Sequence, residues 1–177
     1  MEFSELAKVR QSDRKYLDKP VEREKIEQCM ETARMAPSAN NSQPWKFVVV
    51  DTPHLRTQVA GAAASMGMNK FVQTAPVIIA VVLEKGAALS SVASVIQDKE
   101  YALLDLGIVV NQLCLQAADL GLGTCIVGWF GEKKVKQLLG VDKKRRVPLL
   151  ITLGYPDSPA RPKSRKPISQ ICSWNEY

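Results

Sequence analysis

The chain has 177 residues, and 24 Lys+Arg against 18 Asp+Glu give it a formal net charge of +6 at pH 7. The hydrophobic share of 46% and the charged share of 24% are those of ordinary globular proteins. Gly and Pro number ten each, which excludes collagen-like and low-complexity chains. We expect one folded domain over residues 1–177, long enough to bury a core without disulfides or metals.

The hydropathy pattern predicts no membrane-spanning helix. The longest purely apolar run, Ala75–Leu83, has nine residues, whereas a membrane span needs about 20. The first residues, Met1-Glu2-Phe3, do not open an apolar segment, so no signal peptide is expected. We therefore expect no membrane partner.

The cysteines and the single histidine narrow the chemistry. The four cysteines lie far apart, each in or beside an apolar stretch, which is typical of small buried thiols in a reducing cytoplasm. They are Cys29, Cys114, Cys125 and Cys172. A metal cage of several histidines is impossible with one histidine. His54 follows Pro53 at an expected helix start, which predicts a surface residue rather than a member of a catalytic triad.

In chain order, the N-terminal half predicts a short helix over Ser4–Val9 and a helix with a 3.6-residue apolar period from Val21 to the residue before Pro37. A loop of turn-forming residues follows over Pro37–Pro44, and a strand over Trp45–Val50. The half ends with an alanine-rich helix over Pro53–Ser65 and a strand buried on both faces over Val77–Leu83.

The C-terminal half follows Ser90–Ile96, whose pattern is ambiguous. It predicts a long helix over Asp98–Leu120, a strand over Thr124–Val127 and a short helix over Glu132–Leu139. A strand over Pro148–Tyr155 and a tail rich in Pro, Lys, Arg and Ser over Pro156–Tyr177 complete it. The long helix is apolar on most sides, so part of its burial could come from a second subunit. The mixed order of helices and strands indicates an α+β domain.

Two short basic segments could bind a phosphate. Arg10, Ser12 and Arg14 alternate, so in an extended segment they project to one side. Two guanidinium groups and a hydroxyl can hold a phosphate, with arginine binding it bidentately. Lys163-Ser164-Arg165 repeats this chemistry near the C-terminus. Solvated surface charge is the alternative interpretation of both segments.

The Pro37–Pro44 loop offers mixed hydrogen-bonding groups. Asn40, Asn41 and Gln43 each carry donors and acceptors, and the small residues between them allow close approach to a flat ligand. A flavin edge presents that mixture, with N3–H as donor and O2, O4 and N5 as acceptors. A helix-to-strand turn is the alternative.

Other motifs point to different ligands but fit them poorly. Gly121-Leu122-Gly123 resembles the start of a dinucleotide-binding loop, yet it closes a helix and precedes a strand, the reverse of what that loop needs. The basic clusters 143–146 and 161–166 are the candidates for nucleic-acid binding. No aromatic residue is interleaved with them, which weakens a base-stacking surface, and we expect no nucleic-acid partner.

Five blocks in this order resemble the flavin-dependent nitroreductase family: Arg10–Arg14, Met35–Val49, Gly121–Cys125, Gly154–Pro156 and Lys163–Pro167. The resemblance implies a nitroreductase-like α+β fold with a central mixed, mainly antiparallel sheet flanked by helices. It also implies a homodimer with two FMN sites at the subunit interface and a C-terminal arm, residues 156–177, exchanged between the subunits.

The resemblance also assigns FMN-binding roles to residues of this chain. Phosphate and ribityl contacts would come from Arg10, Ser12, Lys163 and Arg165, and Arg14 would lie near flavin N1 and O2. The other subunit would contribute Pro37, Ser38, Ala39 and Asn41, with Gln43 orienting that loop. Asn69 would reach the pyrimidine edge, and Ile126, Val127 and Gly128 would lie on the N5 side.

The activity implied is ping-pong hydride transfer from NADH or NADPH through flavin N5 to a nitroaromatic, quinone or related electron-poor acceptor, with no catalytic side chain. Two departures matter. Val127 stands where a glutamate often stands in the family, and the chain lacks the insertion that covers the substrate pocket in larger members. The pocket would be open or shaped by Ser65–Phe71 and Ser90–Gln97.

Three alternatives remain. The first is a specialised flavin enzyme on the same fold, of the dehalogenase or flavin-degrading type. The second is a flavin-binding module without turnover, which the Val127 departure suggests. The third is a non-enzymatic basic protein that binds nucleic acid.

Overall fold

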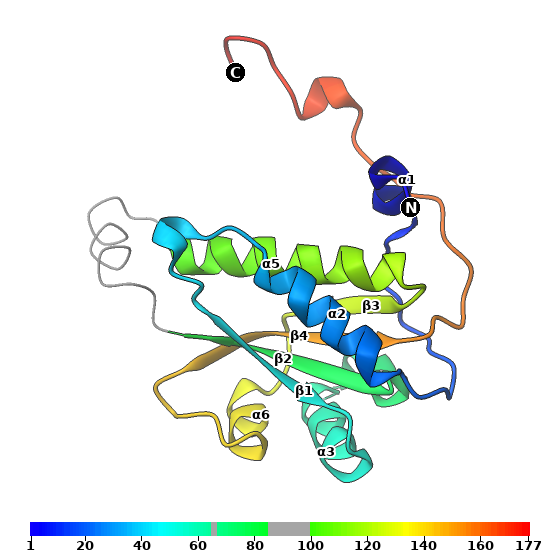
Figure 1. Ribbon diagram of the computed structural model, residues 1–177, viewed down its shortest axis with the longest axis vertical. Coiled ribbons are helices and arrows are strands. Elements are labelled where there is room, and N and C mark those ends of the chain that lie inside the picture. Colours follow the sequence, from blue (N-terminus) through cyan, green and yellow to red (C-terminus); the bar gives the residue numbers. More distant parts are fainter. Residues whose placement is uncertain (65–66, 85–99) are drawn as a thin grey trace.

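The computed structural model describes residues 1–64, 67–84 and 100–177 (Figure 1). Its helices are α1 (Phe3–Val9), α2 (Arg23–Arg34), α3 (Pro53–Ala63), α5 (Tyr101–Asp119) and α6 (Glu132–Leu138). Short 3-10 turns are η1 (Ala39–Asn41), η3 (Lys70–Thr74) and η4 (Ile168–Gln170). The strands are β1 (Trp45–Val50), β2 (Val77–Leu83), β3 (Gly123–Val127) and β4 (Arg146–Gly154).

Among the described residues, four strands form one sheet in the order β1-β2-β4-β3, and their three pairings are antiparallel. A parallel contact is added by Ser12, which forms an isolated bridge with Thr124 on the edge strand β3. The structure therefore confirms the predicted α+β class with a mainly antiparallel sheet. It also leaves β3 as the edge on which the N-terminal segment lies.

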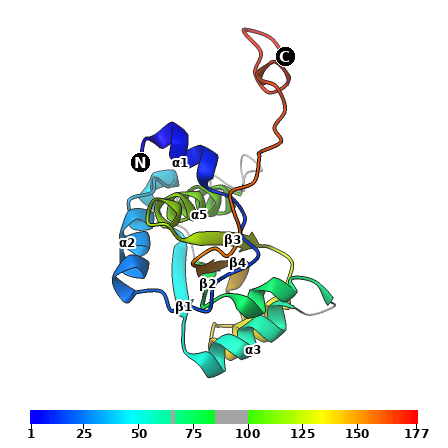
Figure 2. The same cartoon turned by 90° about the vertical axis from the view of Figure 1, so that its right-hand side faces the viewer.

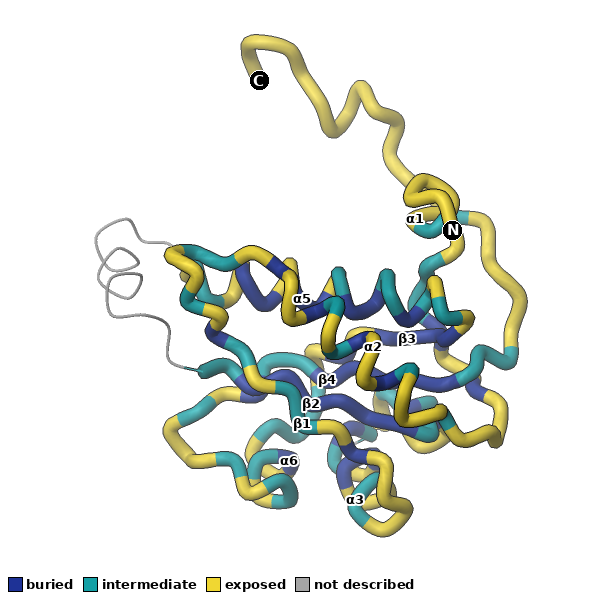
Figure 3. Tube along the Cα trace, in the orientation of Figure 1, coloured by how far each residue is buried: buried dark blue, intermediate teal, exposed yellow. Residues whose placement is uncertain are grey.

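Helices cover both faces of the sheet. Helices α2 and α5 lie on one face, and α3 and α6 lie on the other (Figures 1 and 2). Alternate residues of β2 enter the two cores: Ile79 packs in the cluster that includes α5, and Ile78 packs in the cluster that includes α3 and α6. Strand β2 is therefore buried on both faces, as its unbroken apolar run predicts (Figure 3).

Helix α5 is buried along only part of its surface. Its core side includes Leu106, Val110 and Leu113, whereas Leu104 is 60% exposed and Ile108 is 44% exposed. By length and composition alone, α5 could cross a membrane. Its packing against α2 and the sheet identifies it as a core helix instead. One chain thus leaves uncovered a large part of the apolar surface seen in the sequence.

The remaining differences from the predicted elements are small. The strand expected over Pro148–Tyr155 spans Arg146–Gly154, and the helix expected from Val21 begins at Arg23. Residues 65–66 and 85–99 lie outside the described residues, so the Ser90–Ile96 segment and the first two residues of the long helix are not placed. His54 is exposed, as predicted. The buried-thiol prediction holds for Cys29, Cys114 and Cys125 and is wrong for Cys172, which is exposed because it lies on the C-terminal arm.

The C-terminal arm extends away from the sheet beyond α1 (Figures 1 and 2). Residues 164–177 are exposed throughout (Figure 3). They include three large apolar side chains, Ile168 at 73%, Ile171 at 65% and Trp174 at 85% exposure. Such a segment buries too little apolar surface in one chain to offset the entropy of ordering it.

Candidate functional site

A basic cavity of about 370 Å³ lies where the first and last segments of the chain meet. Five predicted site residues line it: Arg10, Ser12, Arg14, Lys163 and Arg165. Gln11, Arg161, Pro162 and Ser164 complete the wall. The structure therefore brings both predicted phosphate-binding segments to one place.

The N-terminal wall is an extended segment fixed to the sheet edge. The Asp13 N–H donates to the Thr124 carbonyl over 2.8 Å, beside the parallel bridge between Ser12 and Thr124. In an extended segment alternate side chains share a side, so Arg10, Ser12 and Arg14 can all line the cavity.

The opposite wall is residues 156–163, which we call the strap. Every second strap residue contacts the N-terminal segment. Asp157 N–H donates to the Lys15 carbonyl over 3.0 Å, and the Pro159 carbonyl accepts from Gln11 Nε2 over 3.3 Å. Arg161 and Lys163 continue the series toward α1. The strap and the N-terminal segment therefore run antiparallel.

Lys163 joins the strap to α1. Its ammonium donates to the carbonyls of Ala7, over 2.6 Å, and Arg10, groups at the C-terminal end of the helix that lack helical partners. Burial and the neighbouring charges of Arg10 and Arg165 lower the pKa of Lys163. The cavity thus holds cations in excess, and an anion within it would relieve their repulsion. One ammonium N–H remains for that anion, since the group has three donors.

Further predicted residues lie along the same sheet edge. Ser12 and Thr124 are bridged in parallel, so Arg14 and Ile126, each two residues further along its own segment, should lie side by side. Ile126 is 42% exposed. Arg14 also lies over the Phe71 ring, 5.8 Å from its centroid. Asn69 Nδ2 donates to the Trp129 carbonyl over 2.6 Å, next to Gly128. These residues extend the site from the basic cavity along β3.

Val127 does not share that exposure. Its side chain is buried and packs with the core cluster beneath β3. Because side chains alternate along a strand, Ile126 and Gly128 face outward while Val127 faces inward. Of the three predicted N5-side residues, Val127 can therefore contribute only backbone groups to an outward-facing ligand.

The predicted loop residues form a separate unit at the start of α5. The Ala39 N–H donates to Asp105, with Oδ1 at 3.1 Å and Oδ2 at 3.2 Å, and Asp105 is buried. Ser38 Oγ accepts from the Gln43 N–H over 2.9 Å, and Gln43 Nε2 donates to Asn41 Oδ1 over 3.1 Å. Pro37 precedes this network. The loop is thus shaped by its own hydrogen bonds and held by one buried carboxylate.

One chain does not bring this loop to the basic cavity. Asp105 holds the loop near the N-terminal end of α5, whereas the Met1 amino group lies 3.0 Å from Asp119 at the other end, close to α1 (Figure 1). Arg10 shares a small cavity with Ala118. The 13 residues from Asp105 to Ala118 span roughly 20 Å of helix. Within one chain, the loop and the basic cavity therefore lie at opposite ends of α5.

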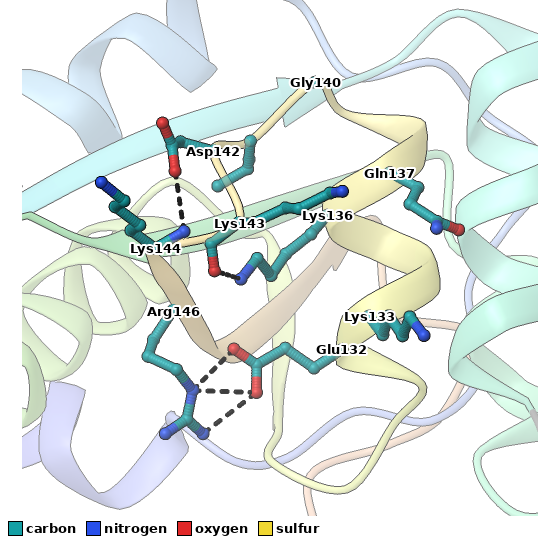
Figure 4. Close-up of a pocket in the computed structure, with 10 residues that line it drawn as sticks. Glu132, Lys133, Lys136, Gln137, Gly140, Asp142, Lys143, Lys144 and Arg146 are labelled. Carbon is teal, nitrogen blue, oxygen red and sulfur yellow. Dashed lines mark hydrogen bonds and ion pairs between the residues drawn. The ribbon is translucent and has the colours of Figure 1, made fainter.

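A larger cavity, of about 820 Å³, lies between α6 and the turn into β4 (Figure 4). It is lined by Lys143, Lys144 and Arg146 of the 143–146 cluster that the sequence offers for nucleic-acid binding, whereas Arg145 forms an ion pair with Glu84. Arg146 is already paired with Glu132, which accepts from both Nε and Nη2, and Lys136 Nζ donates to the Lys143 carbonyl. Among the described residues, no aromatic side chain lines this cavity. Its chemistry suits a solvated surface better than base stacking.

Gln11 and Asp105 have clear places at the site and were not predicted. Phe71 was predicted only as the end of the pocket segment Ser65–Phe71, and Arg161 only within the nucleic-acid candidate 161–166. The alternation that identifies Arg10, Ser12 and Arg14 would have found Arg161, since Arg161, Lys163 and Arg165 alternate in the same way. The positions of Phe71 and Asp105 depend on tertiary packing. Of the two segments proposed to shape the pocket, residues 65–66 and 90–97 lie outside the described part of the chain.

The fold and the cavity define a small α+β protein with a cavity lined by basic residues. A sequence profile of the Nitroreductase family matches residues 7–155, and the chain belongs to this family. An oxygen-insensitive NADPH nitroreductase of Helicobacter acinonychis is 28% identical over 181 residues, covering 85% of each chain.

Solved structures agree. A nitroreductase family protein from Streptococcus pneumoniae TIGR4 superposes with a TM-score of 0.85 at 30% identity, covering 98% of this chain and 100% of that one. An FMN-dependent nitroreductase from Clostridium difficile R20291 superposes with a TM-score of 0.81 at 25% identity, covering 97% and 98%. These likenesses establish the nitroreductase fold and support a flavin oxidoreductase function in general terms.

Proposed function

We propose that the protein is an FMN-dependent oxidoreductase that accepts hydride from NADH or NADPH and reduces nitroaromatic, quinone or related electron-poor acceptors. The basic cavity carries this proposal. Arg10, Ser12, Lys163 and Arg165 supply the charge and the hydroxyl donor that a phosphate monoester requires. Burial, and after it the charges of Arg10 and Arg165, lower the pKa of Lys163, and a bound phosphate would offset both effects. The residues present therefore fit the phosphate of FMN.

FMN would supply the hydride-carrying chemistry, and the chain would supply binding, orientation and charge. Arg14 would place a cation beside the ring, where it favours an anionic reduced form, and Phe71 holds that guanidinium by a cation–π contact. Asn69 and the Ile126–Gly128 backbone would orient the ring edge.

The functional unit would be a homodimer. The Pro37–Gln43 loop and the basic cavity lie at opposite ends of α5, so a second copy would bring its own loop to the cavity. The exposed apolar residues Leu104 and Ile108, with Phe3, line a cavity of about 540 Å³ on the uncovered side of α5. A second α5 would cover this surface, and the free apolar arm would find its contacts on the partner.

Anaerobic spectroscopy tests the proposal. Purified protein should be yellow, bind one FMN per chain, bleach with NADH or NADPH, and recover its colour with a quinone or a nitroaromatic. Arg165→Gln should weaken FMN binding, while Lys144→Gln, which removes equal charge from the α6 cavity, should not.

Protein that stays colourless with added FMN would contradict the site assignment. Bound FMN that neither nicotinamide reduces would favour the binding module without turnover, in line with the inward-facing Val127. Salt-sensitive DNA retention without flavin would favour the nucleic-acid interpretation.

A further inference from the structure

Buried Asp13 stands in the chain between Ser12 and Arg14, two residues that line the basic cavity, and a carboxylate at this position repels a bound anion. Its side chain is 5% exposed, and burial raises its pKa against the opposing effect of a hydrogen bond from Gln11. Gly123 makes room for it, since a Cβ there would lie 2.6 Å from Asp13 Oδ2. Because the Asp13 carboxylate disfavours anion binding, its presence beside the cavity requires a compensating role.

The hydrogen bonds of Gln11 suggest that role. Gln11 Nε2 donates to Asp13 Oδ1 over 2.8 Å, and Gln11 Oε1 accepts from the Arg161 backbone N–H over 3.0 Å. An ionised carboxylate only accepts and a backbone N–H only donates, so these partners permit one orientation of the amide. Gln11 Nε2 also donates to the Pro159 carbonyl, so both ends of the amide meet the strap, and the shorter bond to Asp13 stabilises the orientation in which they do so.

Arg161 is the strap residue that Gln11 holds. Its Nη2 donates to the Ser12 carbonyl over 2.6 Å, and its Nε lies 3.4 Å from Gln11 Oε1. Pro162 follows it, which restricts the Arg161 backbone to extended conformations. A guanidinium has five N–H donors, so donors remain for a ligand in the cavity that Arg161 lines.

We propose that Arg161 is an additional phosphate-binding residue of this protein, and that Asp13 and Gln11 are positioning residues that hold it in the cavity. This inference rests on the proposed function for the identity of the ligand, a phosphate monoester carried by a flavin. Gln11 connects the two walls of the cavity, and Asp13 stabilises its orientation by accepting from Nε2.

Comparing FMN with riboflavin, which lacks the phosphate, isolates the role of Arg161. Loss of one charge-assisted contact should weaken FMN binding about tenfold in Arg161→Gln, with riboflavin binding unchanged. Lys166→Gln is the matched control, because Lys166 is a neighbouring tail cation that does not line the cavity. Fluorescence titrations measure both affinities. Equal FMN affinity in Arg161→Gln and wild type would overturn the assignment.

Asp13→Asn separates positioning from simple charge. If Asp13 acted only as a charge, its removal would tighten FMN binding. If it orients Gln11, the neutral asparagine oxygen accepts a weaker hydrogen bond from Gln11 Nε2 and holds Gln11 and Arg161 less firmly, so FMN binding should weaken while riboflavin binding stays unchanged. Glu5→Gln, on exposed α1, is the charge-matched control. Tighter FMN binding by Asp13→Asn would refute the positioning role.

Two safeguards keep the test decisive. If Asp13→Asn does not fold, as judged by circular dichroism, Gln11→Leu removes the same link and should reproduce the FMN-specific loss. If wild-type protein binds neither flavin, the proposed function fails, and the same variants are compared by calorimetry with inorganic phosphate. Arg161→Gln and Asp13→Asn should then both weaken phosphate binding, and unchanged affinities would overturn the inference.

Discussion

Gly123 allows Asp13 to pack against the start of β3, and Gly123→Ala tests that contact. The new Cβ would lie 2.6 Å from Asp13 Oδ2 and 2.9 Å from its Cγ, closer than non-bonded atoms approach. The carboxylate must turn away, which breaks the hydrogen bond from Gln11. Overpacking costs about 1–3 kcal/mol and a lost hydrogen bond to a charged group about 1.5–3 kcal/mol. We expect the free energy of unfolding to fall by about 3 kcal/mol.

Thermal unfolding followed by circular dichroism measures this loss. For a chain of this size, a loss of about 3 kcal/mol lowers Tm by about 6–12 °C. Gly61→Ala in α3 is the control, because no atom lies within 4 Å of its Cβ position and alanine stabilises a helix by about 1 kcal/mol over glycine. A Gly123→Ala variant with a Tm within about 2 °C of wild type would refute the packing argument.

Three further predictions concern other parts of the molecule. Leu104→Glu should convert the expected dimer to monomers in analytical ultracentrifugation, because it places a charge on the exposed apolar side of α5; an unchanged mass would exclude that surface as the interface. Asp105→Ala should lower the unfolding free energy by about 1–3 kcal/mol in denaturant titrations, because the Ala39 N–H loses its acceptor. Asp105→Asn keeps an acceptor oxygen and should lose less. Burial raises the pKa of Cys29 to about 12, so at pH 8 about one in ten thousand of its thiols is ionised. Exposed Cys172 should therefore react first with a disulfide reagent, and Cys172→Ser should abolish the fast phase.

Local pattern predicted most of the fold. The strands over Trp45–Val50 and Val77–Leu83 have the bounds that their apolar runs predict, because an apolar run between turn-forming residues admits few alternatives. The turn η3 was not predicted, since it depends on packing against α3 rather than on a periodic pattern. The exposed side of α5 is the complementary case, where the sequence contains more apolar surface than one chain can bury.

The site residues were predictable where basic and hydroxyl side chains recur at alternate positions along the chain. Alternation indicated Arg10, Ser12 and Arg14 as one group and Lys163-Ser164-Arg165 as a second, and the family resemblance assigned both to one ligand. Asp105 gave no signal, because a single acidic residue in an apolar helix has many uses. Its role depends on the loop of another segment packing against it, which no local pattern reveals.

The strap has a consequence for how the chain folds. Its contact between Lys163 and Ala7 closes a loop of 156 residues, whereas the sheet is complete by Gly154. Long-range contacts form late because loop closure must precede them, so the cavity should be among the last features to assemble. A chain truncated after Pro156 would retain the sheet and lose the strap. In the untruncated chain, a ligand bound between the two walls would hold the N-terminal segment and the strap together. At concentrations well above its Kd, the stability it adds would rise with the logarithm of its concentration.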